Sequence, residues 1–96
     1  MIEQVVMVIH EVAGRFRASF PDFPGCTAES DTRDDLYDKG ADALHEHVAR
    51  LVIEGQPIPH IRTEKELQAK GLLPSPFDAV VDSVEIDLPA KPKGAA

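Results

Sequence analysis

The sequence contains no tryptophan, a single tyrosine and a single cysteine. One cysteine, Cys26, excludes an intrachain disulfide and is typical of a reducing compartment. No apolar run approaches the roughly 20 residues that a membrane-spanning helix needs. The N-terminus has no basic stretch leading into an apolar one, so no secretory signal is predicted. We therefore expect a cytoplasmic protein without a membrane segment.

Basic residues are also scarce, with 10 lysines and arginines against 17 aspartates and glutamates, for a formal net charge of −7. Nucleic-acid-binding surfaces are usually basic, so the charge argues against direct DNA or RNA binding. A basic protein would be a complementary partner. The 96 residues are enough for one domain. A domain of this size has a thin core, and we expect a homodimer or tetramer.

The first third of the chain predicts strands. Residues 2–9 are rich in β-branched side chains and predict a strand that is buried on both faces toward its middle. Residues 10–14 predict a turn of about four to five residues, which would make a β-hairpin with the next segment. Residues 15–20 alternate polar and apolar side chains, as in a half-buried strand. The apolar face of that strand consists of Phe16, Ala18 and Phe20.

Two prolines and a glycine interrupt the pattern at residues 21–26 and predict a bend. Residues 27–30 predict a short third strand. A long helix is expected over residues 32–54, with Thr32 or Asp31 as its N-cap. Its apolar stripe, at spacings of three and four, consists of Leu36, Gly40, Ala43, Leu44, Val48 and Leu51.

The second half of the chain predicts a short helix and a last strand. Thr63 and Glu66 have the spacing of a capping box, which opens a helix of about two turns. Residues 79–88 predict a strand with one wet face, and residues 90–96 lack core side chains and are expected to be disordered. The expected domain spans residues 1–89. The fold class is α+β: a small, mostly antiparallel sheet in the order β-β-β-α-β, with one long helix packed on one face and a short extra helix.

Three blocks of sequence, in order, resemble the HicB antitoxin family. They are SFPDFPGC at residues 19–26, SDTRDD at residues 30–35 and EGQPIP at residues 54–59. The last strand also fits the family pattern. The sequence departs from it at Ser30, where the family usually has glycine, and at Gly40, where alanine is common. It departs also at residues 60–78, which hold the inserted short helix.

The resemblance implies a partial ribonuclease H-like fold that has lost its catalytic carboxylates. It implies an antitoxin of a type II toxin–antitoxin system, which binds and neutralises a small, basic, HicA-type ribonuclease that cleaves messenger RNA. Many such antitoxins carry an added C-terminal DNA-binding domain. Here the chain ends about eight residues after the last expected strand, so we expect no direct DNA binding from this chain alone. The alternative is a stand-alone, oligomeric HicB-like regulatory or binding domain with no toxin partner.

An enzyme is the third hypothesis. A nuclease that retains ribonuclease H chemistry would need about four carboxylates converging on Mg²⁺. The acidic residues available are Glu11, Asp82, Glu85 and Asp87. Alternation places Glu85 and Asp87 together on a face in water, where a solvated role is favoured. A retained nuclease would lose its metal-dependent cleavage in Asp82 or Glu85 variants. We expect no enzyme, no cofactor and no metal site.

Other chemistry-bearing residues have plain structural interpretations. His45 and His47 point about 200° apart on a helix and cannot share a metal ion. His45 is expected to be exposed, and His47 to pack at the edge of the apolar stripe. Cys26 would need a base and an activating field to act as a nucleophile. It is better explained as a small buried residue that closes the bend.

Five residues are the predicted partner-binding set: Asp22, Phe23, Asp31, Asp34 and Asp35. Asp22 and Phe23 either hold the bend, by backbone hydrogen bonds and packing, or form a rigid knuckle that contacts a partner. The other three either cap the helix and compensate its dipole or contact and steer a basic toxin. Both interpretations are open for each group.

Overall fold

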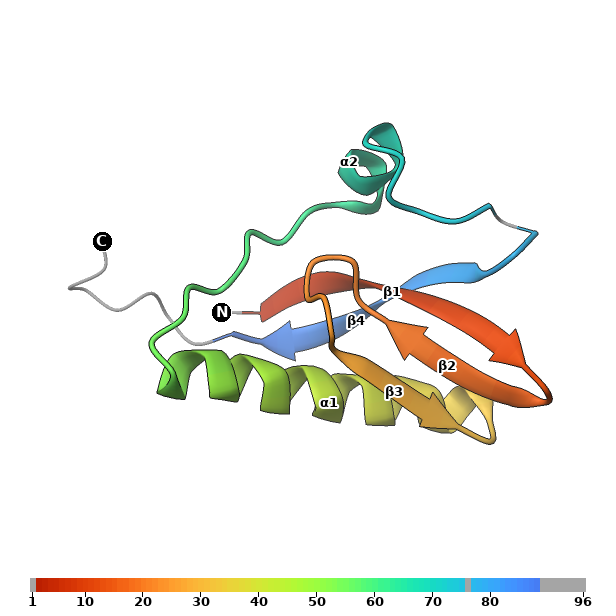
Figure 1. Cartoon of the computed structure of the whole chain (residues 1–96), viewed down its shortest axis with the longest axis horizontal. Coiled ribbons are helices and arrows are strands. Elements are labelled where there is room, and N and C mark those ends of the chain that lie inside the picture. The colour runs from red at the N-terminus through yellow and green to blue at the C-terminus, as the bar shows by residue number, and fades with distance from the viewer. Residues whose placement is uncertain (1, 76, 89–96) are drawn as a thin grey trace.

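The structure is a computed structural model that describes residues 2–75 and 77–88. It is an α+β fold in which a four-stranded antiparallel sheet of order β3-β2-β1-β4 carries the long helix α1 along one face (Figure 1). The expected class is therefore confirmed. The elements are β1 (Ile2–Val12), β2 (Arg15–Ser19), β3 (Thr27–Ser30), α1 (Arg33–Ile53), α2 (Glu64–Ala69) and β4 (Val80–Asp87).

The turn between β1 and β2 is shorter than the sequence predicted, and the prediction of a loop over residues 10–14 was wrong. β1 continues to Val12, which pairs with Arg15. Only Ala13 and Gly14 form the turn, and both have positive φ, of 52° and 78°. Two-residue turns of this kind match the twist of the paired strands. Polar residues at the end of β1 suggested a loop, although they are exposed positions within a paired strand.

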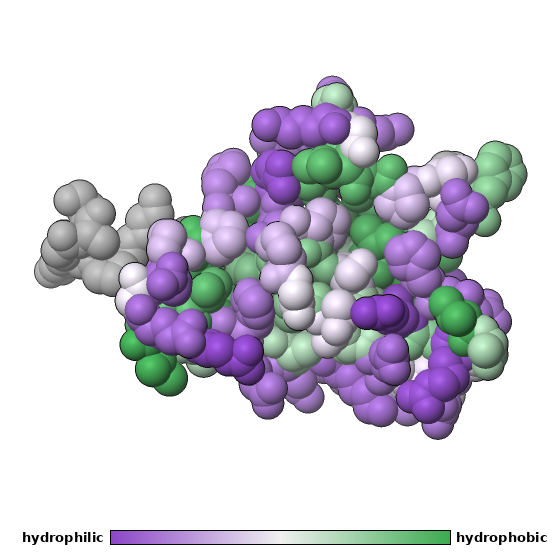
Figure 2. Space-filling view, in the orientation of Figure 1, coloured by the Kyte–Doolittle hydropathy of each residue, from purple (hydrophilic) through white to green (hydrophobic). Residues whose placement is uncertain are grey.

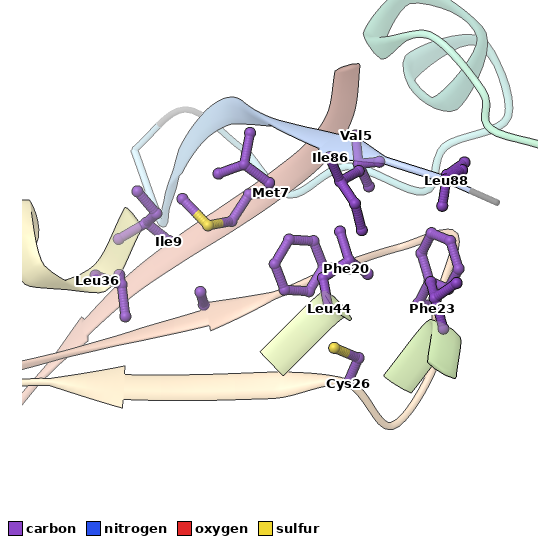
Figure 3. Packing of buried hydrophobic residues seen from close by; sticks show 13 residues of the cluster. Val5, Met7, Ile9, Phe20, Phe23, Cys26, Leu36, Leu44, Ile86 and Leu88 are labelled. Carbon is purple, nitrogen blue, oxygen red and sulfur yellow. The ribbon is translucent and has the colours of Figure 1, made fainter. Parts of the chain in front are cut away.

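The main core lies between the sheet and α1. Every second residue along each strand faces the helix. Figure 3 shows Phe20 and Leu44 among the buried side chains of this layer. The buried part of the helix stripe is Leu36, Gly40, Leu44 and Val48, as expected, with Ala43 and Leu51 partly buried. The expected apolar faces of β2 and β4 also pack here.

Gly40 explains one departure from the family pattern. A Cβ atom at this position would lie 3.1 Å from Met7 Sδ and 3.4 Å from the Phe20 ring. The helix therefore approaches the sheet closely at Gly40, and an alanine would require Met7 to move.

The opposite face of the sheet is also covered near its middle. Val6 and Val8 point away from α1, yet they are only 4% and 3% exposed. Leu67 of α2 is fully buried, and Leu72 and Leu73, from the segment after α2, line a groove together with Val8. The inserted short helix and its following segment therefore give the sheet a second apolar layer, which explains why β1 is apolar at successive positions.

Both helices have the predicted N-caps. Thr32 Oγ1 accepts a hydrogen bond from the backbone N–H of Asp35 at 3.2 Å, so Thr32 and not Asp31 is the cap. Thr63 and Glu66 form the complete capping box, with reciprocal bonds of 3.1 Å. The expected disordered tail, residues 90–96, lies outside the described residues.

Candidate partner-binding surface

The bend at residues 21–26 folds inward. The backbone N–H of Phe23 donates to the carbonyl of Phe20, and that of Cys26 donates to the carbonyl of Phe23, each at 3.0 Å. Gly25 has φ +88°, a conformation that favours glycine. These two successive turns direct the side chains of the bend toward the core and leave Pro24 and Gly25 exposed.

Asp22 is buried and fully engaged within the chain. Its Oδ2 accepts the backbone N–H of Arg62 at 2.8 Å, and its Oδ1 accepts Arg62 Nε at 2.7 Å. The Asp22 side chain is 2% exposed and that of Arg62 is 25% exposed. A charge-assisted bond of this kind ties the bend to the connection between the helices. Arg62 lies 40 residues away in sequence, and no local pattern could have identified it.

Phe23 is 1% exposed and packs edge-on against the His47 ring, with centroids 5.9 Å apart and planes at 86°. This geometry is a favourable aromatic arrangement. It confirms the expected packing role of His47, while His45 is exposed. The contacts seen for Asp22 and Phe23 are thus internal ones that fix the bend, and their contact with a partner stays a prediction.

The acidic residues at the start of α1 are exposed. Asp31 pairs with Arg15 Nη1 at 3.3 Å in an ion pair that is itself exposed. Asp34 and Asp35 occupy the first turn, where negative charge is favourable next to the helix dipole. Asp38 and Asp42 continue the acidity along exposed positions of the same helix. In Figure 2 the edge of the molecule formed by α1 is largely hydrophilic, and a basic protein could reach it.

The carboxylates considered for ribonuclease H chemistry are divided between the two faces of the sheet. Asp82 shares the α1 face with Val84, whereas Glu85 points to the other face. There, Glu85 Oε1 accepts a bond from Gln4 Nε2 at 3.0 Å. Among residues 2–75 and 77–88, no three His, Cys, Asp or Glu side chains gather where they could hold a metal ion.

Asp82 has a partner that the sequence analysis missed. The Tyr37 hydroxyl, from α1, donates to Asp82 Oδ2, and the backbone N–H of Ser83 donates to Oδ1 at 2.8 Å. The bond from Tyr37, followed by the bond from Ser83, lowers the pKa of Asp82. The same bond to Asp82 raises the pKa of Tyr37. Asp82 thus joins the edge strand to the first turns of α1.

Cys26 is 4% exposed. Burial raises the pKa of its thiol, and the nearby charge of Arg50 opposes this only in part. A thiol with a raised pKa remains protonated near neutral pH, where the thiolate is the nucleophilic form. The position therefore fits a packing residue, as the sequence suggested.

In the part of the chain that the structure describes, neither helix has the length and apolar character needed to cross a membrane.

Comparison with known proteins identifies the family. Residues 5–93 match a family model described as "HicB_like antitoxin of bacterial toxin-antitoxin system". No curated protein matches the sequence significantly. Solved structures do resemble it. A chain of a HicA3 and HicB3 toxin–antitoxin complex is 26% identical, with a TM-score of 0.66, over 91% of this chain and 99% of that one.

Two structures of antitoxins alone are also similar. The N-terminal domain of the Burkholderia pseudomallei antitoxin HicB is 27% identical, with a TM-score of 0.69, over 90% of this chain and all of that one. The antitoxin HicB3 is 25% identical, with a TM-score of 0.72, over 91% of this chain but 62% of that one. With the family model covering most of the sequence, the chain belongs to the HicB-like antitoxins of bacterial toxin–antitoxin systems.

Proposed function

We propose that this chain is an antitoxin that binds and neutralises a small HicA-type toxin, a ribonuclease that cleaves messenger RNA. The observation that carries the proposal is the family match over residues 5–93 together with the similarity to a chain of a HicA3–HicB3 complex. Neutralisation would be stoichiometric, with one molecule covering the active surface of another.

A role without catalysis is part of the proposal. Asp82 and Glu85 lie on opposite faces of the sheet and each has a hydrogen-bond partner, so they do not converge. Cys26 is buried with a raised pKa. Both observations support binding and not chemistry as the task of this chain.

Electrostatics supports a basic partner. The chain carries a formal net charge of −7. Asp34 and Asp35 are exposed in the first turn of α1, and Asp31 is exposed just before its N-cap. A ribonuclease needs positive charge to hold the phosphate backbone of RNA. The acidic helix start would steer such a protein toward the complex and compete with RNA for its basic surface.

Asp22 and Phe23 would contribute by a different route. Because both side chains are engaged internally, they would hold the shape of the bend whose exposed part is Pro24 and Gly25. The proposal also includes action in the cytoplasm, a homodimer or tetramer as the unit, and no direct DNA contact by this chain alone.

Co-expression with the protein of the adjacent reading frame tests the proposal. The chain should co-purify with that protein in a stable complex and relieve its toxicity. A neighbour that is not a short basic protein, or one that forms no complex, would contradict the antitoxin role and favour a stand-alone domain.

The acidic surface has its own test. The double variant Asp34→Lys/Asp35→Lys should associate with the toxin more slowly than the wild type at low salt, and the difference should shrink at high salt. Stopped-flow association measures the rate. The double variant Glu46→Lys/Glu54→Lys is a matched control, because it changes the net charge equally at a residue in the second half of the same helix and at its C-cap. Equal slowing by both variants would show an effect of net charge alone.

A further inference from the structure

A notch is lined by residues of the β1–β2 hairpin, by the first residue of α1 and by the segment that leads into β4. Its volume is about 320 Å³, and Ile9, Phe16, Ala79 and Val80 supply its apolar lining. Phe77 stands at its edge. We call this feature the hairpin-end notch. It forms because α1 begins only at Arg33 and leaves the last residues of β1 and the first of β2 uncovered.

The notch carries the most exposed large apolar side chain of the described residues. Phe77 is 96% exposed, and the neighbouring Val80 is 41% exposed. Single exposed apolar residues are ordinary on protein surfaces. Here, however, an aromatic ring, a second exposed apolar residue and a cavity lined by both apolar and charged side chains occur together. Burial of a Phe side chain stabilises by about 1.5–3 kcal/mol. Phe77 is exposed in the monomer, so it would gain this free energy only on binding a partner.

The backbone at Phe77 and at the two residues after it is hydrogen-bonded to Ser75. Its backbone N–H donates to Ser75 Oγ at 3.3 Å. The N–H groups of Asp78 and Ala79 donate to the carbonyl of Ser75 at 2.9 and 3.2 Å. An aromatic side chain on a hydrogen-bonded backbone loses less conformational entropy on binding than one on a free loop. The exposed ring is therefore presented to solvent in a form suited to an anchor.

The charges around the notch select the partner. Glu11 and Asp78 line it, and the only cation among its lining residues is Arg33. The charge of Arg33 acts on Tyr37 and on Asp82, whose pKa it helps to lower. Two carboxylates and one guanidinium thus line the notch. The helix start with Asp34 and Asp35 follows Arg33 directly. Exposed apolar side chains next to several carboxylates fit a partner that offers an apolar contact among lysines and arginines.

We propose that the hairpin-end notch, with Phe77 as its aromatic anchor, is the contact by which this chain binds its basic toxin. The proposal rests on the proposed function, and it names the residues that would carry most of the affinity. A few buried aromatic residues usually dominate an interface. The aspartates of the helix start would then set the association rate, and Phe77 would set the lifetime of the complex.

Binding of Phe77→Ala to the toxin tests the proposal directly. Dissociation should be at least about tenfold faster than for the wild type, as for a binding hot spot, and the effect should persist at high salt. Ile53→Ala is the matched control, because Ile53 is 84% exposed at the far end of α1 and should leave binding unchanged. Surface-plasmon resonance at low and high salt gives both rates, and thermal melts should show both variants folded as the wild type.

Each outcome separates this proposal from the function on which it rests. If the wild type binds the toxin and Phe77→Ala dissociates within twofold of it, the notch is not the anchor and the antitoxin role stands. If the wild type itself does not bind, both proposals fail. If Phe77→Ala changes only the self-association seen by sedimentation, the notch is an interface between copies of the chain, and the toxin contact is overturned.

Discussion

The bend at residues 21–26 and the start of α1 both carry aspartates, but they use the carboxylate in opposite ways. Asp22 is buried; the Arg62 guanidinium compensates its charge through one short hydrogen bond, and the backbone N–H of Arg62 donates a second. Asp34 and Asp35 are exposed in the first turn of α1, where the helix dipole favours negative charge. In the bend, the carboxylate forms an internal ion pair that stabilises the fold. At the start of α1, the carboxylates are exposed to solvent and can interact with another molecule.

The same contrast holds for the phenylalanines. Phe23 is 1% exposed and packed on His47, and Phe77 is 96% exposed. Removing a buried ring should cost stability, and removing an exposed one should cost binding. Replacing Phe23 and Phe77 therefore separates a residue that stabilises the fold from one that the chain exposes to a partner.

The largest expected effect on stability comes from the buried ring. Phe23→Ala should lower the free energy of unfolding by about 3–5 kcal/mol, because the side chain leaves a cavity in the core. Phe77→Ala should change it by less than about 0.5 kcal/mol. Urea unfolding followed by circular dichroism measures both. A large loss of stability in Phe77→Ala would show that its ring is buried in solution, for example between two copies.

The next largest loss of stability is expected on breaking the buried ion pair, and breaking an exposed ion pair provides the comparison. Arg62→Ala leaves the buried Asp22 carboxylate without its charged partner and should cost about 3 kcal/mol. Arg17→Ala breaks a pair with Glu29 whose atoms are 4.0 Å apart and whose side chains are more than half exposed, and it should cost about 0–0.5 kcal/mol. Chemical unfolding of the two variants gives the comparison. Equal losses would mean that the Asp22–Arg62 contact is not what holds the bend.

The smallest effect concerns the bond between α1 and β4. Tyr37→Phe removes the donor that lowers the pKa of Asp82, so that pKa should rise toward its ordinary value. In the wild type, the lowered pKa stabilises the fold above the unfolded-state pKa, and this contribution is lost as pH falls through the folded value. Tyr37→Phe should therefore unfold with a weaker pH dependence in acid, at a cost below about 1 kcal/mol.

The Tyr37 hydroxyl makes a contribution to stability with the opposite pH dependence, which is lost at high pH. Its raised pKa stabilises the fold below the ordinary tyrosine pKa, and this contribution is lost as pH rises through the folded value.

Carboxyl-carbon NMR titration measures the pKa of Asp82 in the wild type and in Tyr37→Phe. Glu66, whose pKa is lowered by its bond with the Thr63 backbone, serves as an internal control and should titrate identically in both. An unshifted Asp82 would contradict the assigned bond.

Much of the fold could be predicted because its signals are local. Period-two alternation identified β2 and the buried face of β4, and side-chain capping identified Thr32 and the box at Thr63 and Glu66. The β1–β2 turn was misjudged because the last residues of β1 lie beyond the cover of α1, where exposed polar side chains look the same in a strand and in a loop.

The candidate site was harder to predict, because burial and exposure depend on distant partners. Asp22 and Phe23 were identified from a motif, but only the packing of Arg62 and His47 against them shows that both are internal. Phe77 was not identified at all, since a lone aromatic residue in a proline-rich connection predicts burial as readily as exposure.

The sequence by itself determined the number, order and type of the elements, the acidic charge and the resemblance to HicB, because each depends on residues close together in the chain or on composition. The tertiary structure alone decided which face each side chain occupies and which charges meet. It buried Asp22 against Arg62, placed Asp82 and Glu85 on opposite faces of the sheet, and left Phe77 exposed at the hairpin-end notch. Those outcomes follow from contacts between segments tens of residues apart, which no local pattern encodes.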